Sequence, residues 1–127
     1  MVKLQTDNYV EQAEKVMQDL QAAGKGQIKL TTSKIRSILA MVSELYNDAQ
    51  RLRAENLSED LVGRVQYLKM RVAYEAGRDD VVRDFVEMAQ LLGEIDRVGR
   101  KKERLILFCH YMEALVAYHK FLGGRDN

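Results

Sequence analysis

The apolar residues of this chain recur at intervals of three and four positions, which is the spacing of one face of a helix. No segment alternates with the period of two that marks a half-buried strand. The first predicted helix runs from Asp7 to about Ala23 and is ended by Gly24. Its expected buried residues are Val10, Ala13, Met17 and Leu20.

Three further helices are predicted from capping residues and apolar stripes. Thr31 or Thr32 caps the second helix, whose expected inward residues are Ile35, Ile38, Leu39, Val42, Leu45, Tyr46 and Ala49. Ser58 caps the third, which ends at Gly77, and its inward residues are Leu61, Val65, Leu68, Val72 and Ala76. Asp79 or Asp80 starts the fourth, which continues through Phe85, Ala89 and Leu92 towards Ile95.

The fifth predicted helix, Leu105 to Leu122, has fourteen apolar residues among its eighteen and is ended by Gly123 and Gly124. Its core stripe comprises Leu105, Phe108, Cys109, Met112, Leu115, Val116 and His119. A second apolar arc lies across from that stripe and comprises Leu107, Tyr111, Ala114, Tyr118 and Phe121. A helix with two apolar sides is either wrapped within its own fold or in contact with another chain.

The composition supports one all-α domain over residues 1–127, a compact bundle of about five helices. The chain is 46% hydrophobic and has no proline and no long linker. No purely apolar run is longer than the five residues of Leu105 to Cys109, which is too short to span a membrane. Acidic residues interrupt the apolar positions of the first twenty residues, so export is not expected. The single cysteine, Cys109, excludes an internal disulfide and fits a reducing cytoplasm.

The net charge is only +1, but the basic residues are clustered. Lys25, Lys29, Lys34 and Arg36 form an acid-free run at the start of the second helix. Positive charge there opposes the helix dipole, and a bound phosphate would resolve the conflict through free backbone N–H groups and the hydroxyls of residues 31–33. The alternative is that these side chains extend into water.

Arginine and tyrosine alternate along one face of the third helix. Arg64, Tyr67, Arg71, Tyr74 and Arg78 fall within one arc, away from the buried stripe. Guanidinium groups can hold phosphates while aromatic rings stack on bases, which suits single-stranded nucleic acid. The alternative is a solvated face with both tyrosines packed on a neighbouring helix. Lys69 lies at the opposite border of the stripe, where it can snorkel along the core edge.

A third basic run precedes the fifth helix and comprises Arg97, Arg100, Lys101, Lys102 and Arg104, opposed by Glu103. Such runs are usually solvated, and nucleic-acid contact is the less frequent outcome. Catalytic and metal sites are not predicted. Cys109 and His110 point about 100° apart on a helix, which is wrong for a nucleophile and its base. His110 and Glu113 would supply two metal ligands, but no second pair accompanies them.

Three segments resemble the signature blocks of a known family. They are KLTTSKIR (Lys29 to Arg36), YLKMRVAYEAGR (Tyr67 to Arg78) and FCHYMEALVAYHKFLGG (Phe108 to Gly124), and the last is the most specific. In the same order and spacing, they resemble blocks of the small helical subunit of type III-A CRISPR effector complexes, the Csm complex. The resemblance covers about residues 29–126, and the first helix carries no matching motif.

The resemblance implies a non-enzymatic subunit that stacks in several copies beside the crRNA-bearing backbone, and the residues themselves predict no metal and no cofactor. Its partners would be the other Csm subunits, the crRNA and single-stranded target RNA, held through the RNA backbone while base pairing reads the sequence. By position, Lys34, Arg36, Lys69, Arg71 and Arg78 become candidate RNA contacts, and the charge pattern adds Lys29 and Arg64. Filament stacking gives a reason for the second side of the fifth helix, so Tyr111, Tyr118 and Phe121 are expected at subunit interfaces.

Two other functions compete with this interpretation. The third and fourth helices, joined by a short turn, superficially fit a helix-turn-helix DNA-binding regulator. Its recognition helix would carry Asp79, Asp80, Asp84 and Glu87, and this acidity opposes entry into the major groove. The other alternative is a helical adaptor that binds protein only.

Overall fold

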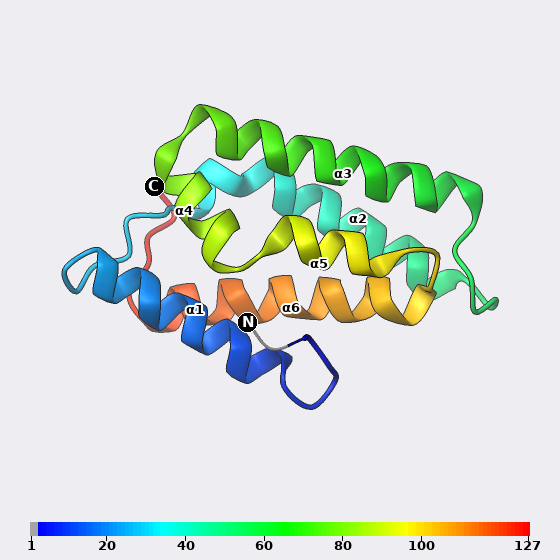
Figure 1. Cartoon of the computed structure of the whole chain (residues 1–127), viewed down its shortest axis with the longest axis horizontal. Coiled ribbons are helices and arrows are strands. Elements are labelled where there is room, and N and C mark those ends of the chain that lie inside the picture. The colour runs from blue at the N-terminus through cyan, green and yellow to red at the C-terminus, as the bar shows by residue number, and fades with distance from the viewer. Residues whose placement is uncertain (1–2) are drawn as a thin grey trace.

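The computed structural model describes residues 3–127, and these residues form six α-helices and one short 3₁₀ helix (Figure 1). The elements in chain order are α1 (Tyr9–Ala23), η1 (Thr32–Ile35), α2 (Arg36–Arg51), α3 (Glu59–Arg78), α4 (Asp80–Met88), α5 (Leu91–Val98) and α6 (Lys102–Phe121). The extended backbone in these residues pairs once, at an isolated antiparallel bridge between Asn56 and Lys101. The all-α prediction is confirmed. The assignment of residues 1–127 to one domain stays a prediction.

The central element of the bundle is α6. It packs against α1, α2 and α5, while α3 lies over α2, α4 and α5 on the far side (Figure 1). Each contacting helix presents a narrow apolar stripe, and α6 presents apolar residues on more than one side, because its neighbours surround it. The predicted core residues Ile38, Leu68 and Leu115 are all fully buried.

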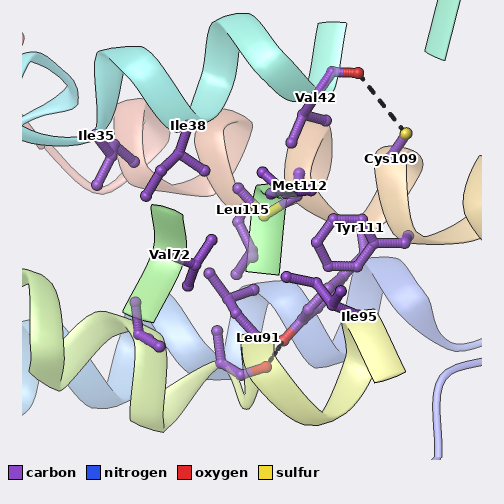
Figure 2. Close-up of a cluster of buried hydrophobic side chains, with 14 of the residues drawn as sticks. Ile35, Ile38, Val42, Val72, Leu91, Ile95, Cys109, Tyr111, Met112 and Leu115 are labelled. Atoms are coloured by element: carbon purple, nitrogen blue, oxygen red, sulfur yellow. Dashed lines mark hydrogen bonds between the residues drawn. The ribbon is translucent and has the colours of Figure 1, made fainter. Parts of the chain in front are cut away.

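The second apolar side of α6 is largely wrapped by the chain's own fold. Tyr111 is 0% exposed, and its hydroxyl donates a 3.0 Å hydrogen bond to the carbonyl of Ala89. Figure 2 shows its ring among the buried side chains, near Leu91 and Ile95. Tyr111 was predicted at a subunit interface, and that prediction is wrong, because the residue has no surface to offer another chain. Phe121, by contrast, is 79% exposed.

The fourth predicted helix is in fact two helices. α4 ends at Met88 and α5 begins at Leu91, because Gln90 adopts a left-handed backbone conformation with φ of 53°. The turn keeps Ala89, Leu91 and Ile95 buried. The apolar spacing therefore continues across the turn and predicts one helix where the backbone has a break.

The predicted helix ends are partly correct. Ser58 accepts a hydrogen bond from the N–H of Leu61, and Asp79 accepts from those of Val81 and Val82, so both caps are confirmed. Three details are wrong: Thr31 makes no capping hydrogen bond, α3 continues past Gly77 to Arg78, and Val10 is 44% exposed.

Candidate nucleic-acid interface

The first two basic segments meet at one end of the bundle. The Nζ atom of Lys34 lies 2.6 Å from Oδ2 of Asp79, which joins η1 to the turn between α3 and α4. Figure 1 shows the start of α2, the end of α3 and the C-terminus gathered there. The hydrogen bond from the Lys34 ammonium lowers the pKa of Asp79, and the capping N–H groups of α4 act in the same direction. We call this region the η1 end.

The predicted phosphate site at the start of the second helix is already filled by the chain's own C-terminal tail. The N–H groups of Thr32 and Ser33 donate to the carbonyls of Arg125 and Asp126, at 3.2 and 2.9 Å. The Thr32 hydroxyl donates to Oδ1 of Asp126 at 3.1 Å. The prediction of free N–H groups here is therefore wrong, since residues 125 and 126 supply the acceptors that a phosphate would have supplied.

The tail is held in place by His119 on α6. The side chain of His119 is 2% exposed, and its Nε2 lies 2.7 Å from the carbonyl of Leu30, to which it must donate. Gly124 packs directly on the imidazole, and its N–H donates to the carbonyl of His119 at 2.7 Å. His119 was predicted to be a core residue, which is confirmed, and it also joins the tail to the segment that precedes η1.

The arginine–tyrosine face of α3 is organised around Glu75. This carboxylate is 8% exposed and lies 2.6 Å from Arg71 and 3.8 Å from Arg78. Both guanidinium groups also lie over the ring of Tyr74, with their carbons 5.2 and 5.7 Å from its centroid. Tyr67 and Tyr74 are each 54% exposed, so neither is packed on a neighbouring helix as the alternative interpretation required.

Two predicted RNA contacts on α3 instead join it to other helices. Arg64 lies 2.8 Å from Asp48 of α2, and this hydrogen bond is the largest cause of its raised pKa. Lys69 lies 2.7 Å from Asp96 of α5. Asp48 and Asp96 offset the positive charge of these two residues. Both are therefore weaker candidates for RNA contact than the charge pattern suggested.

Lys29 and Arg36 differ from the other predicted contacts. Both side chains are exposed, and neither forms an ion pair with any residue in 3–127. The other five, Lys34, Arg64, Lys69, Arg71 and Arg78, each have a carboxylate within 4.0 Å. Among the predicted contacts, uncompensated positive charge at the η1 end therefore comes chiefly from Lys29 and Arg36, with a contribution from Arg78, whose side chain is 61% exposed.

The third basic run lies at the other end of α3. Arg100 pairs with Glu59 at 2.6 Å, which places the α5–α6 turn beside the first residue of α3. α3 has 20 residues and is therefore about 30 Å long. The first and third basic runs consequently lie at opposite ends of α3, and the arginines of α3 extend between them. Figure 1 shows the two ends of α3 at opposite ends of the bundle. Arg53, which belongs to none of the three basic runs, is exposed near the third run.

Cys109 is a buried thiol on α6. Burial raises the pKa of the Cys109 thiol to about 12, so the nucleophilic thiolate is scarce at neutral pH. Its Sγ lies 3.8 Å from the carbonyl of Val42 (Figure 2). Within residues 3–127, no cluster of His, Cys, Asp and Glu is arranged to hold a metal ion. None of the described helices is both long and apolar enough to cross a membrane.

Comparison with known proteins identifies the family. The family model described as Csm2 Type III-A matches residues 3–125. A protein of Streptococcus thermophilus named CRISPR system Cms protein Csm2 is 41% identical over 126 residues, covering 99% of this chain and 100% of the relative. The protein of the same name from Mycobacterium tuberculosis H37Rv is 40% identical, covering 94% of this chain and 95% of its own. A third, from Enterococcus italicus, is 40% identical over 76% of this chain and 71% of its own. The predicted resemblance is confirmed, and the chain belongs to the Csm2 Type III-A family.

Proposed function

We propose that this chain is a non-catalytic, cytoplasmic subunit of a type III-A CRISPR complex that contacts guide and target RNA through the sugar–phosphate backbone. Its partners would be the other Csm subunits, further copies of itself and the RNA strands. Family membership over residues 3–125 is the observation that carries the proposal. Recognition of sequence would then rest on base pairing between guide and target.

The η1 end is the best-supported part of this chain for RNA contact. Lys29, Arg36 and Arg78 project positive charge there, and none of the three is held by a carboxylate closer than 3.8 Å. Tyr67 and Tyr74 add exposed rings along the same face of α3. Cations beside open aromatic faces bind nucleic acid without demanding a particular sequence, because every nucleotide has a phosphate and a stacking surface.

The remaining predicted contacts are given a secondary role in the proposal. Each of the four is already ion-paired with a carboxylate of the chain, so RNA would have to share the cation with that carboxylate. The pairs are Lys34–Asp79, Arg71–Glu75, Arg64–Asp48 and Lys69–Asp96. A shared cation attracts a phosphate less strongly, because the nearby carboxylate repels it. We therefore expect these four residues to shape the surface more than they contribute to affinity.

The proposed stacking contact with further copies is placed at the end of α6. Phe121 is 79% exposed, and its ring meets that of Tyr118 edge to face with 6.2 Å between centroids. Tyr118 is half-buried against the core, so Phe121 is the exposed member of the pair. An exposed aromatic side chain supported by a second ring suits an interface anchor, since aromatic side chains supply much of the binding energy at protein interfaces.

The decisive experiment measures RNA affinity of the full chain by fluorescence anisotropy with a labelled single-stranded RNA of arbitrary sequence. Arg36→Ala combined with Arg78→Ala should weaken binding about tenfold and reduce its salt dependence, because two phosphate contacts are lost. Lys15→Glu is the matched control: it also removes two units of positive charge, but from the exposed face of α1, where Lys15 is paired with Asp19. Equal loss in both variants would show that net charge, and not the η1 end, governs binding.

A further inference from the structure

A groove of about 540 Å³ lies at the end of the bundle away from η1. Its walls come from three distant parts of the chain: the residues around the start of α1, the connection between α2 and α3, and the first turns of α6. The lining residues that matter here are Tyr9, Arg53, Lys101, Ile106 and His110. We call it the α6-start groove.

Backbone hydrogen bonds fix the rim of the α6-start groove. The N–H of Lys102 donates to the carbonyl of Glu55 at 2.9 Å, and the N–H of Leu57 donates to that of Arg100 at 2.8 Å. The ammonium of Lys102 donates to the carbonyl of Leu52 at 2.5 Å. The segments that carry Arg53 and Lys101 are therefore held to one another, so the two side chains project from a constrained frame.

The positive charge of Arg53 and Lys101 is unpaired. Both side chains are exposed, and neither has a carboxylate within ion-pair distance among residues 3–127, although Glu55 and Glu103 also line the groove. On the predicted RNA face of α3, by contrast, each arginine and lysine has such a partner. Two unpaired cations on one constrained rim favour an anionic ligand.

One wall of the α6-start groove is aromatic. The rings of Tyr9 and His110 stack with 5.9 Å between centroids and 28° between planes, and Tyr46 contacts His110 from another side at 5.5 Å. His110 is held by this contact and by a 3.4 Å approach of its Nε2 to the Tyr46 hydroxyl. A half-buried aromatic wall next to two cations matches the two parts of a nucleotide, a flat base and a charged phosphate.

We propose that the α6-start groove is a second contact for single-stranded RNA, in which Arg53 and Lys101 hold phosphates and the wall of Tyr9, Ile106 and His110 receives a base. The inference goes beyond the proposed function, which places RNA at the η1 end, and it rests on this chain being an RNA-contacting subunit. Because the two ends are about 30 Å apart along α3, one strand crossing the molecule could engage both.

The test uses the full chain, a labelled single-stranded RNA of arbitrary sequence, and Arg53→Ala combined with Lys101→Ala. We expect affinity to fall about tenfold and the slope of log K against log salt to decrease by about 1.4, the value for two single-strand phosphate contacts. Lys15→Glu, with the same change in net charge, should leave both quantities nearly unchanged. Arg53→Lys with Lys101→Arg, which keeps both charges, should bind almost as the unmodified chain does.

Photo-crosslinking adds a measurement of where the RNA lies, which a general loss of positive charge does not report. RNA carrying 4-thiouridine should crosslink to peptides containing Tyr9 or His110, and the crosslink should be lost in the Arg53→Ala, Lys101→Ala variant. Both exposed positions leave the core intact, so circular dichroism should show an unchanged melting transition.

The possible failures are distinguishable. If Arg36→Ala with Arg78→Ala weakens binding while Arg53→Ala with Lys101→Ala does not, the groove proposal is overturned and the proposed function stands. If the unmodified chain binds no RNA even at low salt, both are overturned. If the groove variant binds RNA normally but no longer assembles with partner subunits, the groove is a protein interface and the RNA proposal for it is wrong.

Discussion

Individual carboxylates determine how much of the arginine-rich surface is available to a ligand. Glu75 occupies a core position of α3, one turn after Val72, and is 8% exposed. Burying a carboxylate is costly unless it is paired, so Glu75 and Arg71 depend on each other. Arg71 and Glu75 therefore form an ion pair that stabilises the surface of α3. Arg71 is consequently less available for RNA than its place on the outer face suggests.

Arg71→Ala should therefore destabilise the fold more than Arg78→Ala does. Arg71 lies 2.6 Å from Glu75 and its side chain is 29% exposed, whereas Arg78 lies 3.8 Å away and is 61% exposed. Loss of the closer partner leaves the buried carboxylate poorly satisfied, at an expected cost of about 1–2 kcal/mol in the free energy of unfolding. Urea denaturation of the two variants compares them directly, and equal destabilisation would contradict the assigned role of Glu75.

Glu94 predicts a pH dependence of stability. Burial raises its pKa above the ordinary 4.5, with Arg97 partly opposing the shift. The protonated form is therefore favoured in the folded state. Glu94 consequently contributes stability that is fully present below its pKa in the unfolded chain and is lost as the pH rises through its higher pKa in the folded chain. Glu94→Gln, which resembles the protonated form, should raise the melting temperature at pH 7 and change it little at pH 4. The same shift at both pH values would show that titration of Glu94 does not contribute.

At the scale of elements, the C-terminal tail is part of the fold. It passes over His119 and supplies acceptors to the first turn of η1, so α6, the tail and η1 are joined by one set of hydrogen bonds. An added Cβ on Gly124 would meet the imidazole of His119 at 2.4 Å, and that ring is itself enclosed.

Gly124→Ala should consequently destabilise the chain by about 1–3 kcal/mol, as overpacking of a buried site does. Gly63→Ala is the matched control. Gly63 lies within α3 and has open space around it, so alanine there should stabilise the helix by about 0.5–1 kcal/mol. Thermal unfolding followed by circular dichroism distinguishes the two. A neutral Gly124→Ala would mean that the tail is not held against His119.

Elements whose signals are local could be predicted from the sequence. The caps at Ser58 and Asp79 depend on residues two or three positions away, and the inward stripes of α2 and α3 follow helical spacing. The break between α4 and α5 could not be predicted, because it depends on the left-handed backbone of Gln90, a residue with no strong preference for that conformation. The N–H groups expected to be free before α2 could not be placed for a related reason: those of Thr32 and Ser33 in η1 donate to Arg125 and Asp126, far along the chain.

The candidate site was predicted less completely than the fold. A helical wheel can place Arg64 and Lys69 on a surface, but their partners Asp48 and Asp96 are brought close only when α2 and α5 pack against α3. Likewise, the α6-start groove exists because three separate segments converge, and the position of Arg53 beside Lys101 cannot be inferred from its place in the sequence. The sequence therefore shows where basic residues cluster, but only the folded structure shows which of them lack a carboxylate partner.

At the scale of the whole molecule, exposed apolar side chains accompany the cations, as Tyr67, Met70 and Tyr74 do on α3. Unpaired cations lie at the two ends of α3, and the most exposed large apolar side chain of residues 3–127 is Phe121, near the C-terminus. Phe121 lies close to the η1 end, because the residues that follow it supply hydrogen-bond acceptors to η1. It is not a basic residue, so the stacking part of the proposed function can be tested without altering one.

Phe121→Asp should reduce the number of copies of this chain in a complex reconstituted with its partner subunits. The substitution places a charge where an aromatic anchor is proposed, and a charge that is desolvated without a partner weakens an interface. Because Phe121 is 79% exposed, the melting temperature should remain close to that of the unmodified chain. Val10→Asp is the control, since Val10 is an exposed apolar residue on α1, at 44%. Native mass spectrometry counts the copies, and equal numbers in the two variants would exclude Phe121 from the stacking contact.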